Sequence, residues 1–285
     1  MSEVQKVIKY IATAFAILLA VGIITGIVSA AFAVVHTVSG GRISFRGRDE
    51  KTIDFTDSFT DVKSLDINNS SGSLKIMVGE TFKVEAEKVP EGFEAKVTGS
   101  GKLVISDREE GIQFLWFNFG GFDNPNSKIT LYVPADFIAK EAKIDNGAGS
   151  VSLEGLQAKE LTISAGTGNI TGSNLAADKV KIDGGVGNVT FSDVNFKDAD
   201  FDCGVGDLNI DGVLLGKNEI DCGVGSVDLD LIGIEDNYDF SVDTGVGTVK
   251  INGKKVSGDR KTDKNADNSI KIDGGVGDVR IDFAE

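Results

Sequence analysis

The sequence predicts an all-β protein: a single-stranded parallel β-helix, or β-solenoid, with turns of about 19 residues, preceded by an N-terminal transmembrane helix. Three observations support this prediction. A glycine-rich phrase recurs at a constant spacing, apolar and polar residues alternate on either side of it, and a long uncharged segment lies near the N-terminus. The composition agrees, because 36 glycines with only 3 prolines suit stacked strands that must donate their amides to neighbours.

The repeated phrase reads Ile-Asp-x-Gly-Val-Gly-x-Val in clear copies such as Ile182–Val189 and Val242–Val249. Its second glycine stands at positions 149, 168, 187, 206, 225, 247 and 277, so the first four steps are equal in length. Equal steps are typical of a solenoid that makes one turn per repeat. Each turn is expected to lie beside the next one along the chain.

The glycines of each phrase are expected to form a corner of the turn. Alternation is in phase from Val180 to Gly184 and shifts by one residue at Val186. Glycine at a corner permits positive φ and lets stacked corners approach closely. The predicted structural turn residues are Gly147, Gly149, Gly166, Gly168, Gly185, Gly187, Gly204, Gly206, Gly223, Gly225, Gly245, Gly247, Gly275 and Gly277.

Equivalent positions in neighbouring turns should form ladders of side chains spaced by about 4.8 Å. One ladder brings Cys203 beside Cys222, which we interpret as two buried thiols, with a disulfide or a redox or metal role as alternatives. A second ladder is acidic, and its repulsion requires solvent, hydrogen bonds or cations. We favour hydrogen bonds to the glycine turn over calcium, and therefore predict no metal site. The acidic ladder comprises Asp145, Asp183, Asp202, Asp221, Asp243 and Asp273.

The N-terminal segment 11–35 carries no formal charge over 25 residues, enough for a helix to cross a hydrocarbon core of about 30 Å. A cleaved secretory signal is the alternative, because Ala31-Phe32-Ala33 has the form of a signal peptidase site. We expect a single-pass protein of the cell membrane with its C-terminal part outside the cytoplasm. The expected organisation is a short tail (1–10), the anchor (11–35), a linker (36–60), an irregular β region that caps the solenoid (61–140) and regular repeats (141–285).

Charge and residue counts exclude several function classes. A net charge of −15 argues against nucleic acid as a partner. One histidine, His36, and two cysteines leave little material for the common catalytic triads or for a zinc site. We predict no catalytic residues and no cofactor.

Two segments depart from the repeat and are candidate binding regions. The first contains Trp116, Phe117, Phe119 and Phe122, and is either a buried aromatic plug or a surface for a protein, a glycan or the membrane. The second is the insertion 252–269, whose basic residues include Lys254 and Lys255. It is either a solvated loop or a site for an anionic wall polymer.

The phrases above, together with Gly101–Ile105, Ile129–Pro134 and Ile251–Lys255, resemble the bacterial putative adhesin family over about residues 60 to 285. The resemblance implies an extracytoplasmic β-solenoid, often behind one transmembrane segment, in cell-surface adhesion or envelope stress. It supplies no catalytic residues. The expected function is a non-enzymatic, membrane-anchored scaffold with an envelope protein or glycan as partner. The alternatives are a polysaccharide-acting β-helix enzyme with paired aspartates and a calcium-binding structural module.

Overall fold

The computed structural model describes residues 51–107, 113–114, 117–118, 126–256, 260–262 and 264–284. The chain divides into two units, Met1–Glu50 and Lys51–Glu285. The predicted anchor, residues 11–35, therefore lies outside the described residues. Where the structure describes the chain, no helix is both long and apolar enough to cross a membrane.

The described residues are almost entirely β-strands, with one short 3₁₀ helix at Glu235–Asn237. The strands are β1 (Thr52–Phe59), β2 (Ser64–Ser71), β3 (Ser73–Gly79), β4 (Phe82–Pro90), β5 (Glu94–Val97), β6 (Lys102–Ser106), β7 (Gln113–Phe114), β8 (Phe117–Asn118), β9 (Lys128–Pro134), β10 (Ile138–Ala148), β11 (Val151–Glu154), β12 (Gln157–Thr167), β13 (Ile170–Val186), β14 (Val189–Lys197), β15 (Ala199–Val205), β16 (Leu208–Leu215), β17 (Lys217–Val224), β18 (Val227–Ile232), β19 (Tyr238–Val246), β20 (Val249–Ile251), β21 (Lys254–Val256), β22 (Arg260–Lys261), β23 (Asn268–Val276) and β24 (Val279–Ala284).

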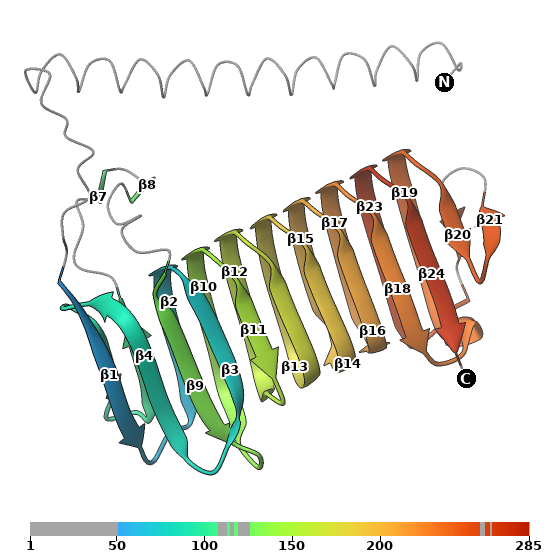
Figure 1. The fold of residues 1–285 in the computed structure, drawn as a ribbon. Coiled ribbons are helices and arrows are strands. Elements are labelled where there is room, and N and C mark those ends of the chain that lie inside the picture. Colours follow the sequence, from blue (N-terminus) through green and yellow to red (C-terminus); the bar gives the residue numbers. More distant parts are fainter. Residues whose placement is uncertain are drawn as a thin grey trace, which may run out of the picture. The chain divides into compact units, whose positions relative to one another are not determined.

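The strands of the second unit stack as the turns of a β-solenoid (Figure 1). Each regular turn contributes two strands that meet at a glycine corner, as β15 and β16 do around Gly206. Parallel pairing joins each strand to its equivalent in the next turn, so Ile163 lies opposite Ile182 and Ile182 opposite Phe201. The predicted solenoid, with one turn per repeat, is therefore present from the middle of the chain onward.

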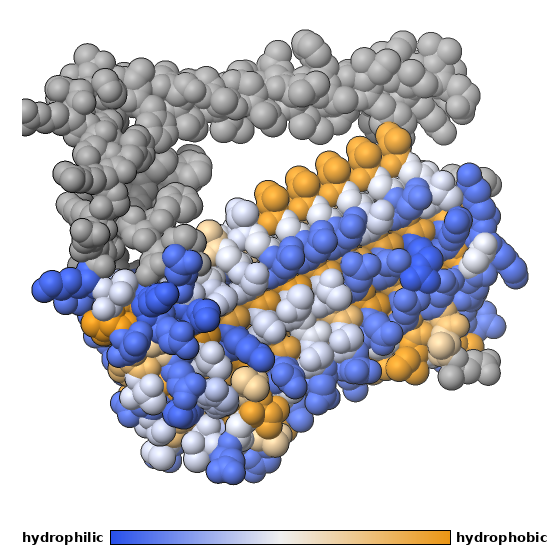
Figure 2. Space-filling view, in the orientation of Figure 1, coloured by the Kyte–Doolittle hydropathy of each residue, from blue (hydrophilic) through white to orange (hydrophobic). Residues whose placement is uncertain are grey.

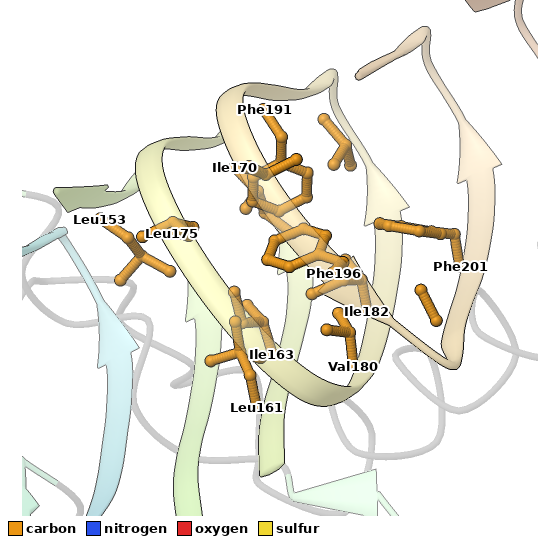
Figure 3. Close-up of a cluster of buried hydrophobic side chains, with 14 of the residues drawn as sticks. Leu153, Leu161, Ile163, Ile170, Leu175, Val180, Ile182, Phe191, Phe196 and Phe201 are labelled. Carbon is orange, nitrogen blue, oxygen red and sulfur yellow. The ribbon is translucent and has the colours of Figure 1, made fainter. Parts of the chain in front are cut away.

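The interior is filled by the residues that alternate inward from both strands of each turn. Ile163, Ile182, Phe201, Ile220 and Ile272 follow one another along the stack, each fully buried. A cluster of three phenylalanines occupies the centre (Figure 3), with ring centroids of Phe191 and Phe196 5.5 Å apart and those of Phe191 and Phe201 6.2 Å apart. Burial of one such side chain contributes about 1.5–3 kcal/mol.

The axial order of the turns differs from the chain order at both ends, which corrects the expectation of sequential stacking. Near the C-terminus, β23 pairs with β17 on one side and with β19 on the other, so the last turn in the sequence is inserted before the preceding one. Near the N-terminus, β2 lies between β6 and β10. The first turn in the sequence, which begins with β2, is therefore the second turn of the stack, and the turn that begins with β6 is the outermost.

Antiparallel strands cover both outermost turns. At one end β5 pairs with β6, β4 pairs with β9, and β1 pairs with β4. At the other end β21 pairs with β20, and β22 pairs with β19. Such covering satisfies edge strands that would otherwise present unpaired amides and carbonyls.

Two of the expected boundaries change. Strand β1 occupies Thr52–Phe59, within the span expected to be a linker, because its apolar residues Phe55 and Phe59 pack against the core. Within the region expected to be irregular, β2 and β3 form a turn with parallel partners β10 and β11. The insertion 252–269 contributes β21 and β22.

Candidate functional site

The glycine corners bring the backbones of neighbouring turns close together. A Cβ atom added at Gly204 or Gly206 would stand under 3.0 Å from the carbonyl oxygen of Gly185 or Gly187, its equivalents one turn earlier. Gly206 also has a φ of 145°, a backbone conformation that residues with side chains rarely adopt. No other residue type fits these corners without displacing the neighbouring turn.

Backbone hydrogen bonds fix the corner. The amide of the second glycine donates to the carbonyl of the valine in the following turn, from Gly187 to Val205 and from Gly206 to Val224, each at 2.9 Å. The same contact joins Gly225 to Val276 and Gly277 to Val246 across the inserted turn, also at 2.9 Å. The backbone of each corner valine is therefore held rigidly while its side chain remains outside.

A polar side chain follows the second glycine and bonds the next turn, a role that the sequence analysis did not identify. Asn188 accepts a hydrogen bond from the Asp207 amide at 3.1 Å, and Asp207 accepts one from the Ser226 amide at 2.8 Å. Asp278 accepts one from the Thr248 amide at 2.8 Å. The sequence does indicate this role, because the position holds only Asn, Asp, Ser or Thr in every regular copy of the phrase.

The valine between the two glycines is exposed in five successive turns. We call these residues the valine ridge; their exposed fractions lie between 50% and 55%. Figure 2 shows them as a row of apolar residues along one edge of the stack. Upstream, the equivalent positions hold Ala148 and Thr167. In axial order the valine ridge is Val186, Val205, Val224, Val276 and Val246.

The acidic ladder lies three residues before the ridge in each turn. In axial order it is Asp145, Ser164, Asp183, Asp202, Asp221, Asp273 and Asp243. Lysines two residues upstream pair with some members, as Lys143 does with Asp145 at 3.0 Å and Lys271 with Asp273 at 2.7 Å. These partners are side chains, whereas the bonds to the glycine turn were expected from the aspartate to its own turn; the residue after the second glycine instead bonds the next turn.

The middle of the ladder carries the greatest excess of negative charge. Where three other turns have Lys143, Lys181 and Lys271, β15 and β17 have Asp200 and Glu219. Partial burial, and then the repulsion of Asp273 and Glu219, raises the pKa of Asp221. Carboxylate oxygens of Glu219, Asp221 and Asp273 lie within 4.8 Å of one another, but Lys271 bonds Glu219 at 2.5 Å and so supplies a cation from the protein itself.

A shallow groove of about 510 Å³ runs along this edge, with a floor of corner glycines. Its wall is the acidic ladder from Asp145 to Asp202, and its floor includes Gly147, Gly166, Gly185 and Gly204. Because the glycines carry no side chains, the edge is recessed between the aspartates and the corner residues. The groove thus follows the axis instead of forming a closed pocket.

The two cysteines lie opposite each other on β15 and β17, buried and as free thiols. A hydrogen bond with Cys203, together with burial, raises the pKa of Cys222. Two buried thiols that contact each other suit the interpretation of small apolar core residues.

The structure describes only some of the predicted binding residues. Trp116, Phe119 and Phe122 lie outside the described residues, and Phe117 is in β8, of whose side chains nothing is described. Lys254 and Lys255 are exposed on β21, where they pair with Ile251 and Lys250 of the terminal turn.

The fold and its corners define a repeat protein of the β-solenoid class. The family model Toastrack DUF4097 matches residues 62–285, most of the chain, and the chain belongs to that family. No curated protein matches it.

Solved structures with similarity to this chain come from several bacteria. One is a putative cell adhesion protein from Clostridium sporogenes, 18% identical, covering 82% of this chain and 100% of that one, with a TM-score of 0.39. A putative adhesin from Bacteroides fragilis is 14% identical, covering 81% and 97%, with a TM-score of 0.39. A putative lipid binding protein from Parabacteroides distasonis is 11% identical, covering 83% and 98%, with a TM-score of 0.39.

Proposed function

We propose that this protein is a non-enzymatic, membrane-anchored scaffold of the cell surface, which uses the corner edge of its solenoid as a docking face. The observation that carries the proposal is the valine ridge. Five half-exposed apolar side chains in one unbroken row are unusual on a protein surface unless something covers them.

Packing within the solenoid does not account for the ridge. The backbone of each corner is satisfied by its own hydrogen bonds, and the earlier corners hold Ala148 and Thr167 instead of valine. The ridge side chains therefore contribute little to the core. A rigid row of apolar groups beside carboxylates supports recognition of a partner better than chemistry at one point.

The enzyme alternative receives less support from the same geometry. The aspartates recur at the same position in each turn and line a shallow groove. Glycosidases instead set two particular carboxylates on opposite sides of one bond. The membrane anchor and the extracytoplasmic location rest on the uncharged segment 11–35.

Site-directed photo-crosslinking in intact bacteria tests the proposal. A photoreactive residue at Val224 should give a discrete adduct, and the adduct should weaken when the neighbours Val205 and Val276 become threonine. The matched control places the same group at Asp211, an exposed position on β16. Equal adducts at both positions, or none at Val224, would contradict a docking face at the corner. Protease added to intact cells should cut the C-terminal unit if the topology is as proposed.

A further inference from the structure

We propose that the corner edge binds a basic amphipathic helix of a partner protein, laid parallel to the solenoid axis. This inference rests on the proposed docking function and names the chemistry of the partner. The apolar stripe of the helix would cover the valine ridge, and an adjacent stripe of lysine or arginine would face the acidic ladder.

Charge complementarity indicates that the partner is positively charged. The ladder positions beside the ridge hold Asp183, Asp202, Asp221, Asp273 and Asp243. Lys181 pairs with Asp183 and Lys271 with Asp273, so the excess of negative charge is concentrated around Asp202 and Asp221. Two further carboxylates, Asp200 and Glu219, stand on the same outer face of β15 and β17. Such a surface repels a second copy of this chain, whose net charge is −15, and it also repels an anionic membrane. A cationic partner relieves the repulsion.

The dimensions of the edge favour a helix over an extended strand. Aspartate and valine are three residues apart in each turn, about 10 Å along an extended chain, which is the diameter of a helix with its side chains. Neighbouring turns are about 4.8 Å apart, close to the helical pitch of about 5.4 Å. A strand laid along the axis would instead repeat the side chains of one face every two residues, which is about 6.6 Å.

The groove beside the ladder lies next to the ridge at Val186 and Val205, since its lining runs from Asp145 to Gly204. Side chains are excluded at Gly185, Gly204 and Gly223, because an added Cβ atom would stand under 3.0 Å from a carbonyl oxygen of the neighbouring turn. Five turns span about 19 Å, which a helix of roughly 13 residues covers. The partner segment is therefore short, with about one apolar residue for each valine.

Binding of synthetic peptides to the purified full chain tests the inference. The probe is a 14-residue peptide with leucine and arginine on adjacent helical faces, and its control is a scrambled peptide of the same composition. We expect the patterned peptide to bind in a salt-dependent manner and the scrambled peptide to bind at least about tenfold more weakly.

Two groups of variants locate the binding. The triple variant Val205→Thr, Val224→Thr, Val276→Thr keeps side-chain shape and should lose at least about tenfold in affinity. The pair Asp202→Asn and Asp221→Asn should lose a similar factor and most of the salt dependence. The control pair Asp193→Asn and Asp211→Asn removes the same charge from exposed positions on β14 and β16 and should leave affinity within about twofold. A single cooperative thermal transition, at or above the melting temperature of the unsubstituted chain, shows that each variant is folded.

Three results overturn the inference: equal binding of the scrambled peptide, equal loss in the control pair, or ridge-dependent self-association in sedimentation. If crosslinking at Val224 gives a ridge-dependent adduct while the peptide fails to bind, the docking face stands and the helical partner falls. If neither is observed, the proposed function falls as well.

Discussion

The central turns and the two ends of the solenoid follow different rules of assembly. From β12 to β16, each strand pairs with its equivalents one repeat away, so Ile163, Ile182, Phe201 and Ile220 stack in chain order. At the ends, partners are far apart: Leu65 lies opposite Ala142, and Ile220 opposite Ile272. The centre depends on local repetition, whereas each end depends on a segment that returns and inserts.

At each end, the turn next to the outermost one is formed by a segment that is distant in the sequence from one of its neighbours. The chain then supplies antiparallel strands to the outermost turns, which pair with β6, β9 and β20 and with Ser241 and Val242 of β19. The comparison suggests that central turns are interchangeable, whereas the inserted turns hold the ends closed.

The strongest test of this difference is to delete a turn from each region. Removal of residues 188–206 joins Gly187 to Asp207 and preserves the corner phrase, so we expect a shorter but folded solenoid. Truncation after Asn265 removes the inserted turn with Ile270, Ile272, Val279 and Ile281, all buried. We expect a loss of several kcal/mol, since each such side chain contributes about 1.5–3 kcal/mol.

Urea unfolding followed by circular dichroism measures both deletions, with limited proteolysis to locate the damage. Preferential cleavage near β19 and β20 is expected only in the truncated chain. If the central deletion unfolds and the truncation does not, the assignment of local and long-range roles is reversed.

The same comparison explains which features could be predicted from the sequence. The corners were predictable because glycine and alternation report local backbone geometry, as at Gly184 to Val186. The axial order was not, because the phrase around Ile272 fits beside that of Ile220 or Val242 equally well. Only the lengths of the connecting segments and the closing of the edge decide between them.

The candidate site was half visible in the sequence. The acidic ladder follows from the spacing of aspartates, and its stacking is confirmed. The valine ridge was present in the phrase but was not interpreted, because an apolar residue within a repeat is ordinarily assigned to the core. Its exposure follows from the shift of alternation at Val186, which turns this side chain outward.

Glycine substitutions should show a large effect at a central corner and a small one in the terminal hairpin. Gly206→Ala brings a Cβ against the carbonyl of Gly187 and is expected to cost more than about 3 kcal/mol. Gly253 has φ of 70° but no atom within 4 Å of an added Cβ, so Gly253→Ala should cost about 1 kcal/mol. Chemical denaturation of the two variants gives the difference, and comparable losses would contradict the steric role of the stacked corner.

The polar residue after the second glycine should have a smaller, additive effect. Asp207→Ala removes the acceptor of the Ser226 amide and is expected to cost about 1 kcal/mol. Asp211→Ala, an exposed position in the same turn, is the matched control and should be neutral within about 0.5 kcal/mol. A loss in the control equal to that of Asp207→Ala would show that charge, and not the hydrogen bond, is responsible.

The smallest effects compare two carboxylates with opposite pKa shifts, one at the seam with the inserted turn and one at the cap. Burial and the neighbouring Asp273 raise the pKa of Asp221, so its charge destabilises the folded state at neutral pH. Asp221→Asn should therefore raise the melting temperature slightly at about pH 7. The difference should vanish at about pH 3, where the carboxyl group is protonated in both states.

Asp239 should behave in the opposite sense because it holds the segment before β23 in place. It accepts hydrogen bonds from the amides of Lys264 at 2.7 Å and Ala266 at 3.0 Å, and these bonds lower its pKa. Asp239→Asn should lower the melting temperature at about pH 7, and the deficit should shrink as pH falls through the folded pKa. Thermal melts across this pH range measure the difference in melting temperature between each variant and the unsubstituted chain. Plotted against pH, this difference should have slopes of opposite sign for the two variants. Slopes of the same sign would mean that the seam and the cap do not differ in their electrostatics.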